Sequence, residues 1–181
     1  SNFQIGELVS NTSMTGYQEI ITDNSYCGQI ITMTYPLIGN YGINSDDNES
    51  LSPALFGLVV RDYCDQPSNW RSQESLDSYL KKNSVPGIYG IDTRQLTLKI
   101  RQGGTMKAVM ANPDADTDQI IADLHQADFL HDQVRRVSTS KPFPVPNRGH
   151  KVVLMDFGEK LGIIRELSRR NCDLIVVPWN T

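Results

Sequence analysis

The sequence predicts an α/β protein made of a larger first domain and a shorter second unit. Over residues 3–139, short apolar runs alternate with short segments of helical periodicity. Residues 140–150 contain three prolines and no periodic pattern, which is typical of an extended spacer. Residues 151–181 show an apolar run, an amphipathic segment and a second apolar run. We therefore expect a domain over 1–139, a linker over 140–150, and the incomplete beginning of a second domain over 151–181.

The first helix is predicted from the spacing of Thr15 and Gln18, which matches a capping box with a hydroxyl at N-cap and an amide at N3. The next residues, Asp23-Asn24-Ser25, are turn formers because their side chains can bond backbone groups two residues on. A strand is then expected from Ile30 to Tyr35, and Pro36 ends it.

A loop rich in Gly, Asn and Asp follows over 39–50, and Leu55 to Val60 reads as the next strand. Ser72 is the expected N-cap of a second helix. That helix is predicted to bury three side chains at i, i+3 and i+4, namely Leu76, Tyr79 and Leu80.

Ile88 to Ile91 is a predicted strand, and Asp92 is the expected N-cap of the helix that follows it, with Leu96 and Ile100 inward. Gly103-Gly104 should end that helix, because a left-handed C-terminal turn favours glycine. The domain closes with a strand from Met106 to Ala111 and a helix over 117–127 whose apolar face holds Ile120, Ile121 and Leu124.

In the second unit, Val152 to Met155 and Leu174 to Val177 read as buried parallel strands. The helix between them is expected to turn Leu161, Ile164 and Leu167 inward. Two strands and one helix cannot bury both faces of a parallel sheet. We therefore expect this tail to be poorly ordered, or to pair with a neighbouring chain at its open edge.

Bulk composition argues against several classes of function. The net charge of -4 disfavours a nucleic-acid partner. No apolar run approaches the ~20 residues that span a bilayer, and the first ten residues lack the pattern of a signal peptide. The three cysteines stand in unrelated contexts, so we expect reduced thiols, no metal site and a cytoplasmic protein.

Few residues suggest catalysis. The sequence contains no G-x-C-x-G elbow for a nucleophilic cysteine, and Cys172 precedes a strand rather than following one. Asp156-Phe157-Gly158 matches the magnesium-binding tripeptide of protein kinases, but no other kinase motif accompanies it. We expect a structural or interface role for this turn, with Lys160 as its charge partner. Gly39-Asn40-Tyr41-Gly42 lacks the context of a phosphate loop and is interpreted as a turn.

Three stretches resemble one family, the small (glutamine amidotransferase) subunits of carbamoyl phosphate synthetase. They are TSMTGYQEIITDNSYCGQIITMTYPLIGNYG (12–42), GIYGIDTRQLTLKIRQGGTMKAVMA (87–111) and VVLMDFGEKLGIIRELSRRNCDLIVVP (152–178). The resemblance implies a compact, barrel-like β/β/α first domain. It also implies that residues 151–181 begin a class I glutaminase domain, a flavodoxin-like parallel sheet that is truncated here.

The resemblance implies one site residue in this chain. Ser25 matches the serine of the family's D-P-S-Y turn, which contacts bound L-glutamine across the domain interface. Asn24 stands where the family has proline, which could loosen this turn. The catalytic cysteine and histidine would lie beyond Thr181, so no catalytic residue is expected here.

The leading hypothesis is therefore the small subunit of a glutamine-hydrolysing ligase that forms a heterodimer with a large subunit. The resemblance implies that the large subunit makes carbamoyl phosphate from bicarbonate and ATP with magnesium, so this chain would need no cofactor. Either pyrimidine or arginine synthesis would be served. Arg61, Arg71 and Arg94 are candidate contacts with the large subunit. The alternative is a non-catalytic adaptor module built on the same domain.

Overall fold

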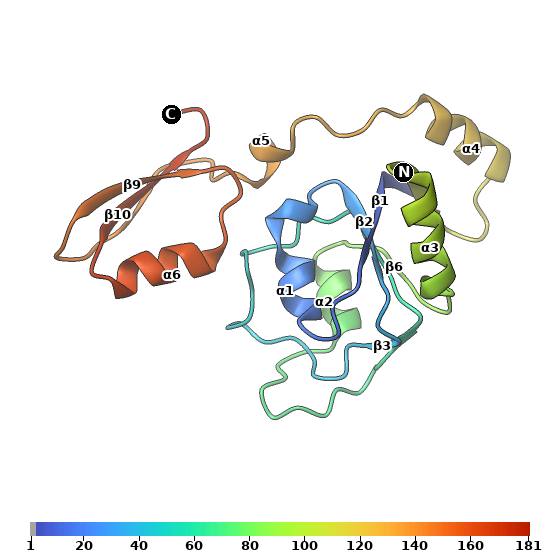
Figure 1. The fold of residues 1–181 in the computed structure, drawn as a ribbon, viewed down its shortest axis with the longest axis horizontal. Helices are drawn as coiled ribbons and strands as arrows, with labels where there is room; N and C mark the ends of the chain where they lie inside the picture. The colour runs from blue at the N-terminus through green and yellow to red at the C-terminus, as the bar shows by residue number, and fades with distance from the viewer. Residues whose placement is uncertain (1–2) are drawn as a thin grey trace.

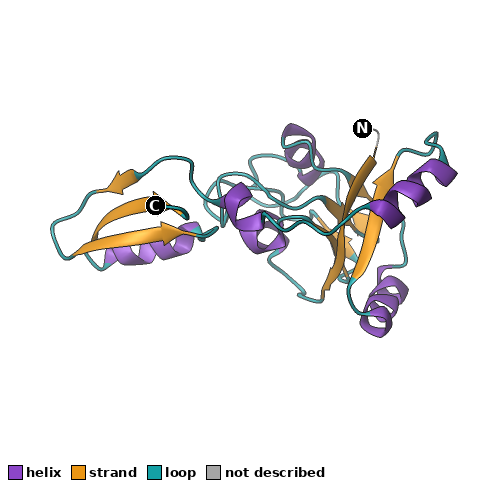
Figure 2. Ribbon diagram, turned by 90° about the horizontal axis from the view of Figure 1, so that it is seen from above, coloured by secondary structure: helices purple, strands orange, loops and turns teal. Residues whose placement is uncertain are grey.

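The computed structural model describes residues 3–181 and shows two units joined by an extended stretch of chain. The first unit holds most of the elements, and the second is a small sheet with one helix laid along it (Figure 1). Seen from above, the second unit extends from one end of the first (Figure 2). The prediction of a mixed α/β fold is confirmed.

The central sheet of the first unit has five strands. These are β1 (Phe3–Asn11), β2 (Gln29–Met33), β4 (Gly57–Val59), β6 (Gly87–Ile88) and β7 (Met106–Ala111). They lie in the order β6-β4-β2-β1-β7, and the sheet is curled into a half-barrel. All neighbours are parallel except β7, which runs antiparallel to β1. β3 (Leu37–Ile38) and β5 (Asp62–Tyr63) form a separate two-stranded parallel sheet.

Helices cover both faces of the sheet. The helices within residues 3–139 are α1 (Tyr17–Thr22), α2 (Leu76–Lys82), α3 (Thr93–Gly103), α4 (Thr117–Gln126) and α5 (Gln133–Val137), with a short 3-10 helix, η1 (Asn24–Tyr26); α5 lies in the stretch that leads to the second unit. Adjacent residues of β2 face opposite ways, as strand geometry requires. Ile31 belongs to the core that α1 and α2 cover, whereas Ile30 belongs to a second core against Leu96 and Ile100 of α3.

Of the predicted helix caps, some are confirmed and others are wrong. The capping box at Thr15 was wrong, because α1 starts after Gly16 in left-handed backbone and has no side-chain cap. The predicted cap at Ser72 was also wrong. The hydroxyl of Ser75 accepts from the N–H of Ser78 at 3.2 Å, so Ser75 caps α2. The cap at Asp92 is confirmed, since its side chain accepts from the N–H of Gln95 at 3.0 Å. Gly104 ends α3 with φ at 70°, as predicted.

Several predicted strands are shorter in the structure. The run to Tyr35 ends at Met33, the run from Leu55 reduces to β4, and the run from Ile88 reduces to β6. Strand β1 was not predicted as an element. On α4, Ile120 is buried as expected, but Ile121 is 46% exposed, so the apolar face is narrower than predicted.

The second unit contains the predicted βαβ pattern: β9 (Lys151–Asp156), α6 (Leu161–Arg169) and β10 (Asp173–Pro178), with β9 and β10 parallel. A third strand, β8 (Phe143–Val145), pairs antiparallel with β10. Part of the segment expected to be a plain spacer is therefore an edge strand of the second sheet. The tail over 151–181, which was expected to be poorly ordered or to pair with a neighbouring chain, is folded here as two strands and a helix.

One face of this second sheet is covered and the other is open. Leu174 and Val176 are buried on the side that α6 covers. On the opposite side Val153 is 68% exposed and Ile175, its partner in the parallel register, is 42% exposed. The two strands predicted to be buried on both faces are therefore buried on one.

Candidate functional site

The turn that holds Ser25 is built from its own side chains. Asp23 is the N-cap of η1, and its Oδ1 accepts from the N–H of Ser25 at 2.9 Å. The backbone N–H of Tyr26 donates to the carbonyl of Asp23 at 3.1 Å, which closes the turn. Ser25 is itself solvent-exposed. The turn chemistry predicted for these residues is confirmed.

An ion pair ties this turn to the second unit. The Nζ of Lys160, which precedes α6, lies 2.9 Å from Oδ2 of Asp23. Burial acts to raise the pKa of Asp23, but hydrogen bonds from Lys160 and Ser25 outweigh it and leave that pKa below its usual value. The same contact with Asp23 raises the pKa of Lys160. Both groups are therefore charged near neutral pH, and the pair links the Ser25 turn to the start of α6.

The turn Asp156-Phe157-Gly158 lies against this contact. The buried Asp156 accepts from the N–H groups of Gly158 at 2.8 Å and Glu159 at 3.0 Å, and from the N–H of Thr139. The structural role expected for Asp156 is confirmed. Its charge partner was predicted wrongly, because Lys160 pairs with Asp23 instead.

Gly158 is required at this turn for two reasons. Its φ is 98°, a conformation that side chains other than glycine rarely adopt. A Cβ built there would also lie 2.5 Å from Cγ2 of Val137 and 3.4 Å from Cβ of Asn24. A side chain at position 158 would therefore clash with Val137, whereas Asn24 lies at ordinary contact distance.

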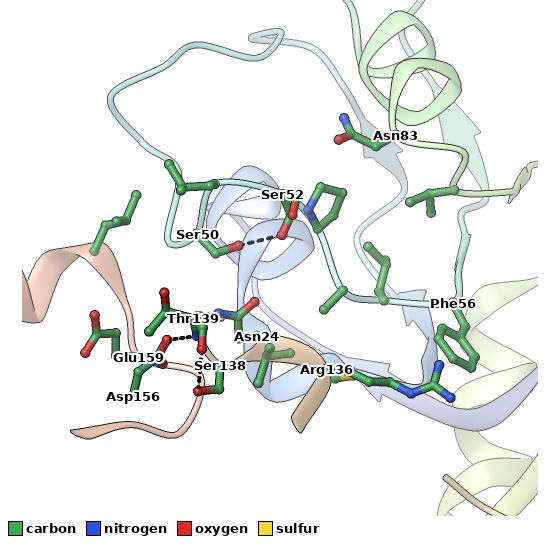
Figure 3. A pocket seen from close by; sticks show the side chains of 18 of the residues that line it. Asn24, Ser50, Ser52, Phe56, Asn83, Arg136, Ser138, Thr139, Asp156 and Glu159 are labelled. Atoms are coloured by element: carbon green, nitrogen blue, oxygen red, sulfur yellow. Dashed lines mark hydrogen bonds between the residues drawn. The ribbon is translucent and has the colours of Figure 1, made fainter. Parts of the chain in front are cut away.

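A cavity of about 690 Å³ lies where the two units meet (Figure 3). Residues of both units line it, and Figure 3 shows Asn24 beside Asp156, Ser138 and Thr139. Ser25 is not among the lining residues, whereas its neighbour Asn24 is. Glu159 lies at the same junction. Its burial, and then its proximity to Asp156, raise the pKa of Glu159 to about 7.

The remaining candidates are the three cysteines and a possible metal-binding cluster. Cys27, Cys64 and Cys172 are free thiols, and Cys172 lies in the turn before β10 rather than on a strand-to-helix elbow. Within residues 3–181, no group of histidine, cysteine and acidic side chains is placed to hold a metal ion. Nor does that part of the chain contain a helix long and apolar enough to cross a membrane.

The predicted turn at Gly39 to Gly42 is confirmed by a hydrogen bond from the N–H of Gly42 to the carbonyl of Gly39 at 3.1 Å. Of the arginines proposed as partner contacts, Arg71 pairs with Asp47 at 2.9 Å, whereas Arg61 makes only a 3.8 Å pair with Asp62. Arg94 is exposed. Their contact with a large subunit stays a prediction.

Sequence reasoning missed Glu159 and the partner of Lys160. Glu159 lies three residues beyond the end of β9, and nothing in its neighbours signals burial. Asp23 and Lys160 are far apart in the sequence, and the only available signal was that each lies in a segment resembling the same family.

Comparison with known proteins gives one consistent result. Residues 1–110 match the family model described as the carbamoyl-phosphate synthase small chain, CPSase domain. The carbamoyl phosphate synthase small chain of Bacillus thuringiensis subsp. konkukian is 58% identical over 176 residues, which is 97% of this chain and 48% of that relative. The pyrimidine-specific small chain of Bacillus subtilis is 53% identical over 176 residues, again 97% of this chain and 48% of the relative. This chain thus spans about half the length of the curated relatives it matches.

Proposed function

Because this chain belongs to the carbamoyl-phosphate synthase small-chain family, we propose that it forms part of the glutamine-binding site of a small subunit. The complete subunit would hydrolyse glutamine and pass ammonia to a large subunit. The large subunit would use bicarbonate and ATP with magnesium to make carbamoyl phosphate. A closed path matters because ammonia that escapes to solvent is protonated, and ammonium is not a nucleophile.

The Ser25 turn supports the binding role. It is exposed, it is fixed by Asp23, and Lys160 ties it to the second unit. A serine hydroxyl can both donate to and accept from the polar groups of an amino acid. We assign Ser25 to the amino acid moiety of glutamine. The catalytic nucleophile and its histidine are assigned to the part of the subunit that this chain does not include.

The open side of the second sheet supports a flavodoxin-like fold for the second unit. β9 is an edge strand, and the sheet face that carries Val153 and Ile175 is exposed. Edge strands and apolar faces of parallel sheets are normally covered. We propose that residues 151–181 begin a flavodoxin-like sheet. In the complete subunit a further strand would pair with β9 and helices would cover the exposed face.

Replacement of Ser25 tests the assignment in the complete subunit assembled with the large chain. Ser25→Leu should impair glutamine-dependent synthesis and spare ammonia-dependent synthesis, because ammonia enters after the glutamine site. Loss of one hydrogen bond to a charged ligand group corresponds to a roughly 10- to 150-fold loss. Steady-state rates with glutamine and with ammonia measure both activities.

Ser68→Leu is the matched control, since Ser68 is exposed in a loop outside the junction. It should leave both activities unchanged. Unaltered glutamine kinetics in Ser25→Leu would remove Ser25 from the site. Complete absence of glutamine hydrolysis in the unmodified subunit would instead favour the adaptor alternative.

A further inference from the structure

A loop of the first unit holds the second unit's helix. The N–H of Leu161, the first residue of α6, donates to the carbonyl of Glu49 at 2.8 Å. One turn further along, Nη1 of Arg165 donates to the carbonyl of Asp46 at 3.0 Å. The first N–H groups of a helix have no partner within the helix. α6 has no side-chain cap, so the carbonyl of Glu49 takes the place of one.

The same loop, residues 44–50, is shaped from beneath by Gln18. Gln18 is fully buried on α1. Its Nε2 donates to the carbonyl of Asn44 and, at 2.7 Å, to Oδ1 of Asn48. Its Oε1 accepts from the N–H of Asn44 at 3.0 Å and from Nδ2 of Asn44 at 3.4 Å. Every donor and acceptor of this amide is therefore hydrogen-bonded to the loop.

Two further buried hydroxyls fasten the other end of the loop. Oγ1 of Thr22 accepts from the N–H of Glu49 at 2.9 Å. Oγ of Ser50 donates to the carbonyl of Thr22 at 2.6 Å. These bonds fix the peptide of Glu49, whose carbonyl holds the start of α6.

A polar residue buried this fully costs free energy unless its bonds are made, and here all of them serve one loop. α1, which carries Gln18, also leads directly into the Ser25 turn. Loop 44–50 and the Ser25 turn are thus connected through α1, and both contact the second unit. The loop holds α6 through backbone carbonyls, and the turn holds Lys160 through Asp23.

We propose that loop 44–50 is the anchor that sets the position of the second unit against the Ser25 turn, and that Gln18 is the positioning residue that shapes this anchor. The catalytic consequence rests on the proposed function: a displaced α6 moves the rest of the glutamine site away from Ser25. Small displacements of positioned groups cost large factors in rate. The anchoring itself does not depend on any activity.

The test uses the complete subunit assembled with the large chain, in three variants. Gln18→Leu keeps the volume and removes all four hydrogen bonds. Arg165→Met removes the outer contact from an exposed position on α6. Gln102→Leu makes the same change as the first variant at an exposed position on α3 and serves as the control.

Amide hydrogen exchange over residues 161–167 should be faster in Gln18→Leu by roughly 10- to 100-fold, the range expected for an unsatisfied buried amide site. Arg165→Met should show a smaller increase, and Gln102→Leu none. The KM for glutamine should rise in the first two variants while kcat with ammonia stays unchanged. The double variant should show less than the sum of the two effects, because both changes act on one contact.

Unchanged exchange over 161–167 in both Gln18→Leu and Arg165→Met would overturn the anchor, whatever the activity does. Additive effects in the double variant would also overturn it. If Gln18→Leu does not fold, Arg165→Met alone decides by the same exchange measurement. Faster exchange with unchanged glutamine kinetics would uphold the anchor and count against the proposed glutamine site.

Discussion

At the scale of single residues, burial decides what a polar side chain can do. Gln18 was interpreted from spacing as part of a helix cap, yet it is buried and bonded to a distant loop. Asp23 keeps its charge in a half-buried position because Lys160 and Ser25 stabilise it. Glu159 lacks such help, and within residues 3–181 its Oε2 is buried without a hydrogen-bond partner. Its environment therefore favours the neutral acid.

Glu159→Gln should change how stability depends on pH. The folded-state pKa of about 7 lies above the ordinary 4.5, so the native state holds the proton longer than the unfolded state. The stability that this proton provides is complete below about pH 4.5 and is lost as the pH rises to about 7. Glu159→Gln should therefore stabilise the protein at pH 8 by about 1–2 kcal/mol, with solvent screening allowed for.

Urea unfolding at pH 5 and pH 8 measures this effect on the chain described here. Asp114→Asn, the same change at an exposed position, is the control and should leave both values unchanged. A gain at pH 8 that is equally large at pH 5 would show that packing, rather than the proton on Glu159, causes it.

At the scale of elements, the sequence predicted well wherever local chemistry is enough. The bounds of β7 match residue for residue, and α3 begins at the cap and ends at the glycine pair that were expected. β1 and β8 were missed because strands are defined by pairing with distant chain. β8 was further hidden by Pro144, which is tolerated here because β8 is an edge strand.

In the candidate site, too, the features set by local chemistry were predictable from the sequence and those set by distant contacts were not. The Asp23 to Ser25 turn was predictable because each of its bonds spans two or three residues. The Asp23–Lys160 pair and the anchor at loop 44–50 were not, because both join segments more than 100 residues apart. Periodicity and spacing carry no information on such contacts.

The corrected cap of α2 gives a prediction at this scale. Ser75→Ala should destabilise the protein by about 0.5–2 kcal/mol, because it removes the acceptor for the N–H of Ser78. Ser72→Ala is the matched control and should cost less, since the Ser72 hydroxyl makes only a 3.4 Å contact with the carbonyl of Glu74. Urea unfolding of both variants measures the difference. The reverse order would return the cap to Ser72.

At the scale of the whole molecule, the two units differ in how fully the faces of their sheets are covered. The first unit surrounds its sheet with helices on both faces and buries two cores. The second covers one sheet face and leaves Val153 and Ile175 exposed on the other. The chain spans about half of its relatives, and its described cysteines are not on a nucleophile elbow. We propose that it contributes binding and positioning to the complete subunit.

Glutamate release from glutamine tests this account most directly, measured side by side for residues 1–181 and for the complete subunit with its large chain. We predict glutamate from the complete assembly, in step with carbamoyl phosphate, and none above background from residues 1–181. Glutamate release by residues 1–181 that is abolished by alkylation of Cys27, Cys64 or Cys172 would contradict this assignment.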